Sequence, residues 1–235
     1  MGYLSHELRT PLAAMRNAMS LVRHPKVNDA MRERSLNTLD GAITNLQSLL
    51  DDALDSFKYG SNDFVLNEAE FGVGELLNSL DSLYSSLAQS RGLEFSVFTD
   101  TAEGLRLTGD VMRLQQMMSN LILNAVKFTP SGRVDVRISS SKAGRDFWRF
   151  EVRDTGPGIS REAQNKLFKP FVQVGDSGSG SGFKGTGLGL TIVAQLTSAM
   201  GGRVGLSSEP GAGSVFYFEV PPRPGVKSAA VLRSV

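Results

Sequence analysis

Apolar residues recur at three- and four-residue spacing through the first part of the chain, and this periodicity is the strongest constraint on its fold. A helix presents residues one turn apart on the same face, so the pattern predicts one amphipathic helix over residues 3–23 and a second over roughly 29–58. Between them Pro25 breaks the helix, and Asn28 or Asp29 is placed to cap the next one. The repeating positions are Leu4, Leu8, Leu12, Met15, Met19 and Val22, then Leu36, Leu39, Ile43, Leu46, Leu49, Leu50, Ala53, Leu54 and Phe57. Two such helices joined by a short loop predict an antiparallel hairpin.

A single hairpin of this kind carries more apolar surface than it can bury. Each helix has an apolar stripe, and one hairpin offers too little surface to bury both stripes against. Pairing with a second copy would bury the stripes in a four-helix bundle, so the sequence predicts a homodimer. The alternative is that the stripes pack against the rest of the same chain.

A mixed pattern follows a break at Lys58 to Asp63, which we expect to be a hinge. Strand pairs joined by short turns favour antiparallel hairpins, and the helices between them predict a layer on one face of a mixed sheet. The expected helices are 72–90, 110–127 and 187–200, and the expected strands are 94–99, 133–139, 147–154, 203–208 and 214–220. We therefore expect a hairpin domain at 1–60, a second domain at 61–222, and a tail or linker at 223–235.

Composition excludes several classes of function. The formal net charge of +1 gives no basis for binding nucleic acid. The absence of cysteine rules out disulfides and thiolate metal sites and fits a reducing compartment, and two histidines are too few for a histidine-rich metal site. No apolar run approaches the roughly 20 residues needed to span a bilayer, and no signal peptide precedes the first helix, so we expect a cytoplasmic location without a membrane segment.

The segment from Ser5 to Leu12 brings a nucleophile and a carboxylate together. In a helix His6 and Thr10 lie one turn apart on one face, with Glu7 beside the histidine. Neutral imidazole is a good nucleophile, and a neighbouring carboxylate can orient the ring and accept its second proton. Pro11 removes a helical hydrogen bond, so we expect a kink there. The alternative is a surface histidine on an amphipathic helix.

The predicted helix 110–127 carries a polar ridge beside its apolar face. The ridge consists of Arg113, Gln116, Asn120, Asn124 and Lys127, within an arc of about 80°. An ordinary solvated ridge is the alternative, but asparagine is a poor helix former. Two carboxamide oxygens one turn apart suit a hard cation and an ammonium group suits phosphate, which together are what Mg²⁺-ATP requires.

A carboxylate ends the predicted strand 147–154. Trp148, Phe150 and Val152 share one face with Asp154, so Asp154 is expected at the mouth of an apolar layer. A carboxylate there would accept a hydrogen bond from the exocyclic amine of adenine. Gly156 and Gly158 follow and would let the backbone pass close to the base, although a simple tight turn is the alternative.

A second glycine-rich segment precedes the last predicted helix. It reads Gly185-Thr186-Gly187-Leu188-Gly189-Leu190, and its amides could face phosphate oxygens at a helix start. It matches neither the Walker loop nor the dinucleotide-binding fingerprint, so on its own it is weak.

Together these segments resemble the boxes of the sensor histidine kinases of two-component systems, in the family's order and over residues 5–219. The matching segments are the H-box at Ser5 to Leu12, the N-box at Asn120 to Pro130, the glycine boxes at Asp154 to Ile159 and Gly185 to Leu190, the lid at Gly175 to Lys184, and the F-box with Phe168 and Phe171. The resemblance implies an α+β fold. A helical hairpin, paired in a dimeric four-helix bundle, would precede the α/β sandwich of the ATPase domains of gyrase, MutL and the ninety-kilodalton chaperone.

The resemblance also implies residue roles in the hairpin. His6 would be the nucleophile that attacks the γ-phosphate of ATP, and Glu7 the base. Glu7 and Thr10 also fit the family's Glu-x-x-Thr pattern for dephosphorylating the partner regulator, and the resemblance leaves open whether that activity is present.

In the second domain, the resemblance assigns the nucleotide. Asn124 would be the Mg²⁺ ligand, with Asn120 the second candidate, and Asn120 stands where related ATPases carry a water-activating glutamate. Lys127 and the amides from Gly187 to Leu190 would hold phosphates, and Asp154 the adenine.

The implied activity is ATP-dependent phosphorylation of His6, followed by transfer to an aspartate of a response regulator receiver domain. The parent protein is expected to be anchored in the inner membrane by a sensory part absent from this chain, and the residues around Phe168 and Gln173 resemble hybrid kinases, in which a receiver domain follows. One rival is an ATP hydrolase of the same fold, which Asn120 and the H-box argue against. The other is a catalytically weak dimerising scaffold, which the complete set of box residues argues against.

Overall fold

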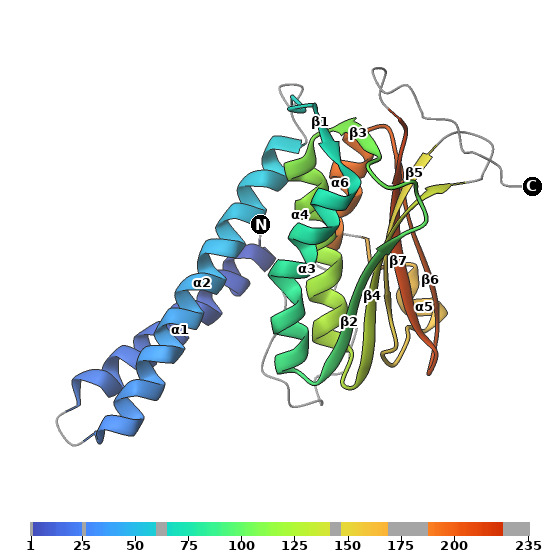
Figure 1. Cartoon of the computed structure of the whole chain (residues 1–235). Coiled ribbons are helices and arrows are strands. Elements are labelled where there is room, and N and C mark those ends of the chain that lie inside the picture. The colour runs from blue at the N-terminus through green and yellow to red at the C-terminus, as the bar shows by residue number, and fades with distance from the viewer. Residues whose placement is uncertain (1, 25–26, 60–64, 142–146, 169–187, 223–235) are drawn as a thin grey trace, which may run out of the picture.

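The first two helices form the expected hairpin (Figure 1). A computed structural model describes residues 2–24, 27–59, 65–141, 147–168 and 188–222. Helix α1 (Gly2–Arg23) continues through Pro11, and α2 (Asp29–Tyr59) runs antiparallel beside it. The side chain of Asn28 accepts a hydrogen bond from the Met31 amide at 2.8 Å, so Asn28 caps α2 as the sequence indicates.

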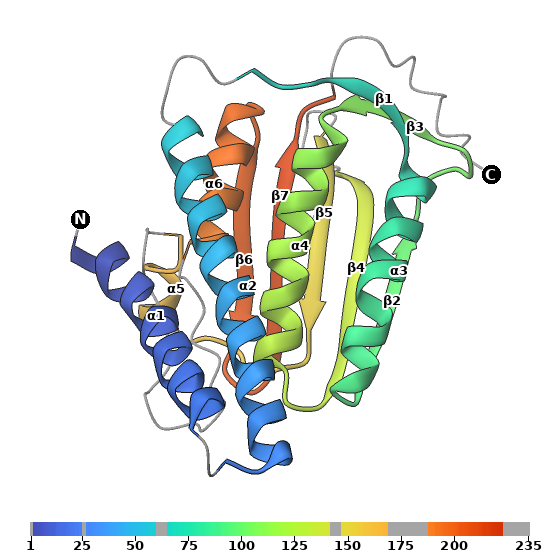
Figure 2. The ribbon, with the colours of Figure 1, turned by 90° about the vertical axis from the view of Figure 1, so that its left-hand side faces the viewer.

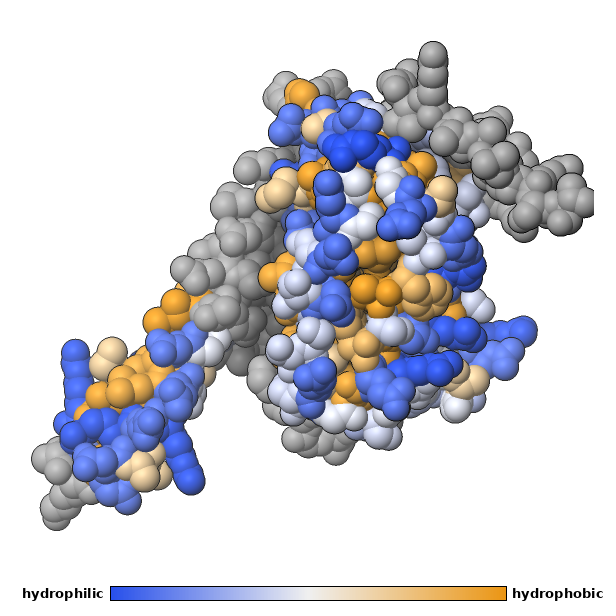
Figure 3. Space-filling view, in the orientation of Figure 1, coloured by the Kyte–Doolittle hydropathy of each residue, from blue (hydrophilic) through white to orange (hydrophobic). Residues whose placement is uncertain are grey.

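The fully buried residues in the described part of the hairpin are small or compact. Ala18, Ser35 and Ala42 are buried, as is Pro11. Larger apolar residues of both helices remain on the outside, and Figure 3 shows them as apolar surface along the described part of the hairpin. These are Leu12, Met19, Met31, Leu36 and Ile43, each between 42% and 53% exposed. Within this chain the outer stripe therefore has no cover over the described part of the hairpin.

A five-stranded mixed sheet forms the body of the second part, as the sequence predicts. Its strand order is β2-β4-β5-β7-β6, in which β2 and β4 are parallel and all other neighbours are antiparallel. The strands are β2 (Leu93–Thr99), β4 (Gly132–Ser141), β5 (Phe147–Asp154), β6 (Arg203–Glu209) and β7 (Gly213–Val220). Helices α3 (Val73–Ser90), α4 (Val111–Phe128) and α6 (Gly189–Ala199) lie side by side over one face of this sheet (Figure 2).

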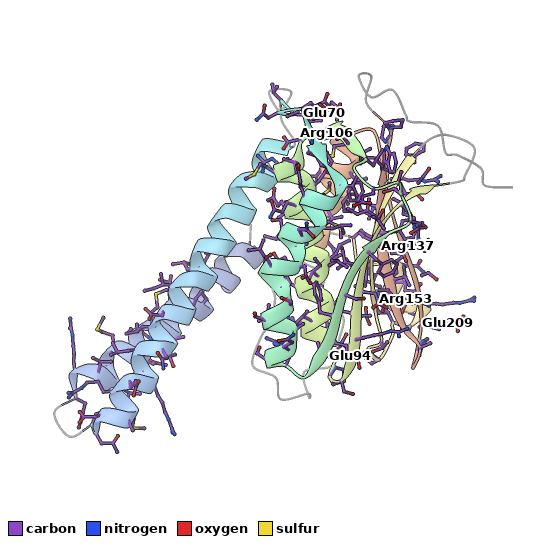
Figure 4. The ribbon with its side chains drawn as sticks, in the orientation of Figure 1. Glu70, Glu94, Arg106, Arg137, Arg153 and Glu209 are labelled. Atoms are coloured by element: carbon purple, nitrogen blue, oxygen red, sulfur yellow. The ribbon has the colours of Figure 1, made fainter. Side chains whose placement is uncertain are left out.

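Three short elements have no counterpart in the sequence prediction. Strands β1 (Ala69–Gly72) and β3 (Arg106–Gly109) pair antiparallel in a small separate sheet, and α5 (Arg161–Gln164) follows the first glycine box. Arg106 of β3 lies 3.5 Å from the carboxylate of Glu70 of β1, and Figure 4 shows both side chains.

The core lies between the sheet and its three helices. Phe150 of β5 and Phe218 of β7 stack with ring centroids 4.8 Å apart, and both are at most 1% exposed. Met117, Met118 and Ile122 of α4 are fully buried against this layer. Helix α2 runs alongside α6, so the hairpin and the sheet domain touch through these two helices. Of the helices in the described ranges, none has the length and apolar character to cross a membrane.

Candidate functional site

Three predicted segments lie along helix α4. The carboxyl end of α4 and the end of β5 meet at the lower edge of the sheet in Figure 1, and the start of α6 lies beside Asn120, near the middle of α4. The backbone carbonyl of Phe128, which ends α4, lies 3.0 Å from the position that a Cβ on Gly156 would take. In the same way, Oδ1 of Asn120 lies 3.3 Å from a Cβ built on Gly189. A side chain at Gly156 would therefore press on the backbone of α4, and one at Gly189 would crowd the Asn120 side chain.

Asp154 occupies the expected position on the core face of β5. Asp154 is only 7% exposed, and its carboxylate accepts a hydrogen bond from the Gly156 amide at 2.8 Å. Burial raises the pKa of Asp154 above its ordinary value of 3.8, while hydrogen bonds from the backbone amides of Gly156 and Ser214 lower it in part. A buried carboxylate with raised proton affinity is the kind of group that recognises a donor on a ligand.

The loop after Asp154 is fixed by contacts on both sides. Thr155 exchanges hydrogen bonds with Arg133 at the start of β4, with its amide donating to the Arg133 carbonyl at 3.2 Å and its hydroxyl accepting from the Arg133 amide at 3.0 Å. Gly158 has a φ of +68°, and a Cβ there would lie 1.9 Å from the carbonyl oxygen of Glu209. Only glycine therefore fits at 158, for reasons of both backbone conformation and space.

The polar ridge on α4 is partly buried, which distinguishes it from a solvated surface. Arg113 donates to Gln116 at 2.8 Å, and Asn120, Asn124 and Lys127 are each half-buried. Asn120 faces the first turn of α6 at Gly189, so the N-box and the second glycine box lie together. The two carboxamides are one helical turn apart on a common side of α4.

Lys127 carries its charge in an unfavourable environment. Burial lowers its pKa below 10.5, and the positive charge of Arg91 lowers it further. Its ammonium group lies 4.8 Å from the centroid of the Phe128 ring. An anion bound beside Lys127 would relieve both unfavourable effects.

Several residues of this site lie outside the sequence prediction. The hydroxyl of Ser208 accepts a hydrogen bond from the Ile159 amide at 2.9 Å and lies 3.0 Å from the hydroxyl of Ser214, which faces Asp154 across the β5–β7 pair. Thr129 is 4% exposed, and its hydroxyl, which lies 3.3 Å from a Cβ built on Gly156, has no hydrogen-bond partner among the residues that the structure describes. The one sequence signal for Thr129 is its position inside the Asn120 to Pro130 segment, and the two serines have none.

The remaining predicted residues divide into three groups. His6, Glu7 and Thr10 lie in α1, one turn apart as expected, and the structure gives their helical backbone alone. Leu188 is buried at the start of α6, and Gly189 and Leu190 form its first turn. Gly185, Thr186, Gly187, Phe171, Gln173, the segment Gly175 to Lys184 and the tail 223–235 lie outside the described residues.

Two family profiles match this chain. Residues 1–62 match the His Kinase A (phospho-acceptor) domain. Residues 109–224 match the histidine kinase-, DNA gyrase B- and HSP90-like ATPase family. The two matches fall on the hairpin and on the part of the sheet domain that contains Asn120, Asp154 and Gly189.

Individual relatives cover nearly the whole chain. The autoinducer 2 sensor kinase/phosphatase LuxQ of Vibrio vulnificus is 36% identical over 225 residues, which cover 94% of this chain and 26% of LuxQ. The structure of full-length ShkA in complex with AMPPNP superposes with a TM-score of 0.70 at 34% identity and covers 93% of this chain and 44% of ShkA. The structure of histidine kinase ThkA in complex with the response regulator protein TrrA gives a TM-score of 0.70 at 25% identity, and the match covers 94% of this chain and 60% of ThkA. The catalytic domain of ThkA alone gives a TM-score of 0.55 at 30% identity, and that match covers 67% of this chain and 99% of the domain. The chain thus spans about a quarter of the length of the curated relatives it matches.

Proposed function

The chain belongs to the histidine kinases, and from this premise we propose that it uses ATP to phosphorylate its own His6 and passes the phosphoryl group to an aspartate of a response regulator. In the first step a ring nitrogen of His6 attacks the γ-phosphorus, and the bond from phosphorus to the bridging oxygen of ADP breaks. Glu7 accepts the proton from the other ring nitrogen. In the second step a carboxylate oxygen of the regulator attacks the same phosphorus, and the histidine nitrogen leaves.

The single observation that carries the nucleotide assignment is the buried carboxylate of Asp154. It lies at the end of β5, beside a loop that only glycine can build at 158, and its pKa is raised. A carboxylate that is poorly solvated gains from the exocyclic amine of adenine and would repel the carbonyl oxygen of guanine. The relative ShkA was solved with AMPPNP, an ATP analogue, which supports the same ligand here.

Asn120 and Asn124 fit a magnesium ion held jointly with phosphates. In the described part of the chain no group of three or more histidine, cysteine or carboxylate side chains could hold a metal by itself. Mg²⁺ usually keeps several waters and takes only one or two protein ligands plus substrate phosphates, and a carboxamide oxygen on α4 meets that requirement. When bound, Mg²⁺ neutralises charge on the β- and γ-phosphates. Lys127 would pair with the same phosphates, and Asn124 would orient the ion.

The absence of a general base at residue 120 supports kinase activity over hydrolysis. Asn120 is half-buried against Gly189, and its neutral carboxamide cannot take up a proton at neutral pH. Water next to the γ-phosphate would therefore lack activation by this residue, whereas His6 on the separate hairpin brings its own neighbouring Glu7. We propose residues 1–60 and 61–222 as these two working units, joined near the end of α2.

The exposed stripe of the hairpin supports a homodimer. Ala18, Ser35 and Ala42 are buried, whereas several large apolar residues of the two helices, among them Leu12, Leu36 and Ile43, are exposed within this chain. A second copy would cover this stripe and complete a four-helix bundle.

The relatives support a response regulator as the second substrate. ThkA was solved with the regulator TrrA, and LuxQ is named both kinase and phosphatase. We extend the regulator to this chain, and we propose Glu7 and Thr10 as the residues of a phosphatase activity on it. The receiver domain after residue 222 and the cytoplasmic location stay predictions.

Incubation with γ-labelled ATP and Mg²⁺ tests the proposal. We expect a label that is lost in acid and kept in base, as for phosphohistidine, and that disappears in His6→Gln. His24→Gln is the matched control because His24 is the only other histidine, and it should label normally. Label that survives in His6→Gln would refute the assignment of the acceptor.

A further inference from the structure

The side chain of Gln164, in the short helix α5, joins two parts of the site that are far apart in the sequence. Its Nε2 donates to the carbonyl of Ile159 at 2.7 Å and to the carbonyl of Ser208 at 2.9 Å. Both partners are acceptors, so only the amide NH₂ group, with its two hydrogens, fits this position. Gln164 therefore ties the end of the first glycine box to strand β6.

Ser208 completes the connection from the other side. Its hydroxyl accepts from the Ile159 amide at 2.9 Å and donates to the Gly213 carbonyl at 2.8 Å. Ile159 thus has both its carbonyl and its amide bound, one by Gln164 and one by Ser208. The amide of Gly211 also donates to the Pro157 carbonyl at 2.7 Å, so the loop is bound along its length to the β6–β7 turn.

This loop needs such restraints because it has little stiffness of its own. It contains two glycines, 156 and 158, whose backbones have more conformational freedom than other residues. It also belongs to no helix or strand between Thr155 and Ser160. The Gly156 amide that binds the Asp154 carboxylate lies at the start of this segment. Displacement of the segment would therefore move the hydrogen bond that orients Asp154.

We propose that Gln164 is a positioning residue for the nucleotide base, acting through the loop from Gly156 to Ile159 and so through Asp154. This inference rests on the proposed function, because it assumes that Asp154 binds adenine. Gln164 does not touch the base. It fixes the loop by two hydrogen bonds to β6 and to Ile159, so that the orientation of Asp154 exists before the nucleotide arrives.

The test is Gln164→Glu, which keeps the size of the side chain and removes both donors. At neutral pH a carboxylate would face two carbonyl oxygens and repel them, so the loop would move away. We expect the Kd of the full chain for Mg²⁺-ATP to rise about tenfold or more, as for losing one to two buried hydrogen bonds. The KM for ATP in autophosphorylation should rise by the same factor, and the rate at saturating ATP should stay unchanged, because base binding is uniform between ground state and transition state.

Gln115→Glu is the matched control. Gln115 is also half-buried, and its Nε2 donates to the Ser79 hydroxyl at 3.1 Å. A hydroxyl can turn and donate to the new carboxylate, so this variant should bind ATP within about twofold of the original chain. If Gln164→Glu fails to fold, Ser208→Ala replaces it, since it removes the acceptor for Ile159 and should also raise KM alone.

The outcomes separate this inference from the proposed function. An original chain that binds no ATP would refute the function. An original chain that binds ATP, with Gln164→Glu binding equally well, would overturn the inference alone. A loss of the saturating rate, or of thermal stability in parallel with affinity, would also overturn it, because the role of Gln164 would then be general folding.

Discussion

Replacing Asp154 with asparagine tests base recognition, because affinity for the nucleotide and stability should change in opposite directions. The substitution keeps the shape of the side chain and exchanges one carboxylate oxygen for an amide NH₂ group. The remaining oxygen can still accept from the Gly156 amide, which is 2.8 Å away in the native chain. The NH₂ group, however, presents donors to the exocyclic amine of adenine, which also donates.

The expected loss of affinity follows from this mismatch. A buried hydrogen bond that is left badly paired costs roughly 1–3 kcal/mol, and the site is buried enough for the full range to apply, since Asp154 is 7% exposed. That free energy corresponds to a Kd for ATP that is about fivefold to 150-fold higher. The base of GTP carries a carbonyl at the same place, so the variant should prefer ATP over GTP less strongly than the original chain does.

Stability should change in the opposite direction at neutral pH. Burial raises the pKa of Asp154 in the folded state, so the folded state binds this proton more tightly than the unfolded state does. The original chain therefore loses stability as the pH rises from the ordinary carboxyl value of 3.8 through the raised folded value, and the asparagine variant does not. We expect Asp154→Asn to be the more stable protein at neutral pH and the difference to shrink as the pH falls towards about 4.

Calorimetric titration with ATP and GTP measures the first effect, and thermal unfolding across this pH range measures the second. Unchanged ATP affinity in Asp154→Asn would refute the base assignment. A variant that is less stable than the original chain at neutral pH would refute the claim that Asp154 is held at a cost to folding.

Four further predictions follow from other parts of the structure. Asn124→Ala should make nucleotide binding insensitive to Mg²⁺, and continued weakening of binding on chelation would point to another ligand. Gly158→Ala should abolish nucleotide binding, because a Cβ would lie 1.9 Å from the Glu209 carbonyl, whereas Gly104→Ala, with φ of +75° and open space, should cost only about 1–2 kcal/mol of stability. Glu219→Ala should lower the free energy of unfolding by about 1–3 kcal/mol in urea titrations, because Glu219 is 2% exposed and binds Arg149 and Arg203. An unchanged urea midpoint would mean that the two arginines are equally well solvated without Glu219. Leu36→Lys should shift the dimer towards monomer in sedimentation at several concentrations, while Asn37→Lys, the same charge on the neighbouring exposed residue, should not; a monomer at every concentration in the original chain would contradict the dimer itself.

The sequence by itself determined the elements whose residues repeat with a regular period. Apolar spacing located α1, α2 and α4 to within a residue or two, because a helical face is encoded by positions three and four apart. Alternation along 147–154 was enough to place Asp154 on the core face of β5, since successive side chains of a strand point to opposite sides. Composition of the α4 ridge likewise identified Asn120 and Asn124 as unusual on a helix surface.

Only the tertiary structure decided how these elements meet. Strands β1 and β3 are four residues long, which is too short for a period to show, and they form because one pairs with the other. Gln164 and Ser208 are unremarkable polar residues in the sequence, yet they hold the loop from Gly156 to Ile159 across separations of 44 and 49 residues. The inner and outer sides of the hairpin were also undecided until Ala18 and Ala42 proved to be buried and Leu36 exposed. A local sequence pattern indicates which side of an element is apolar. Which segment covers that side depends on shape and hydrogen bonding between segments that are distant in the sequence, and these contacts assemble the candidate site.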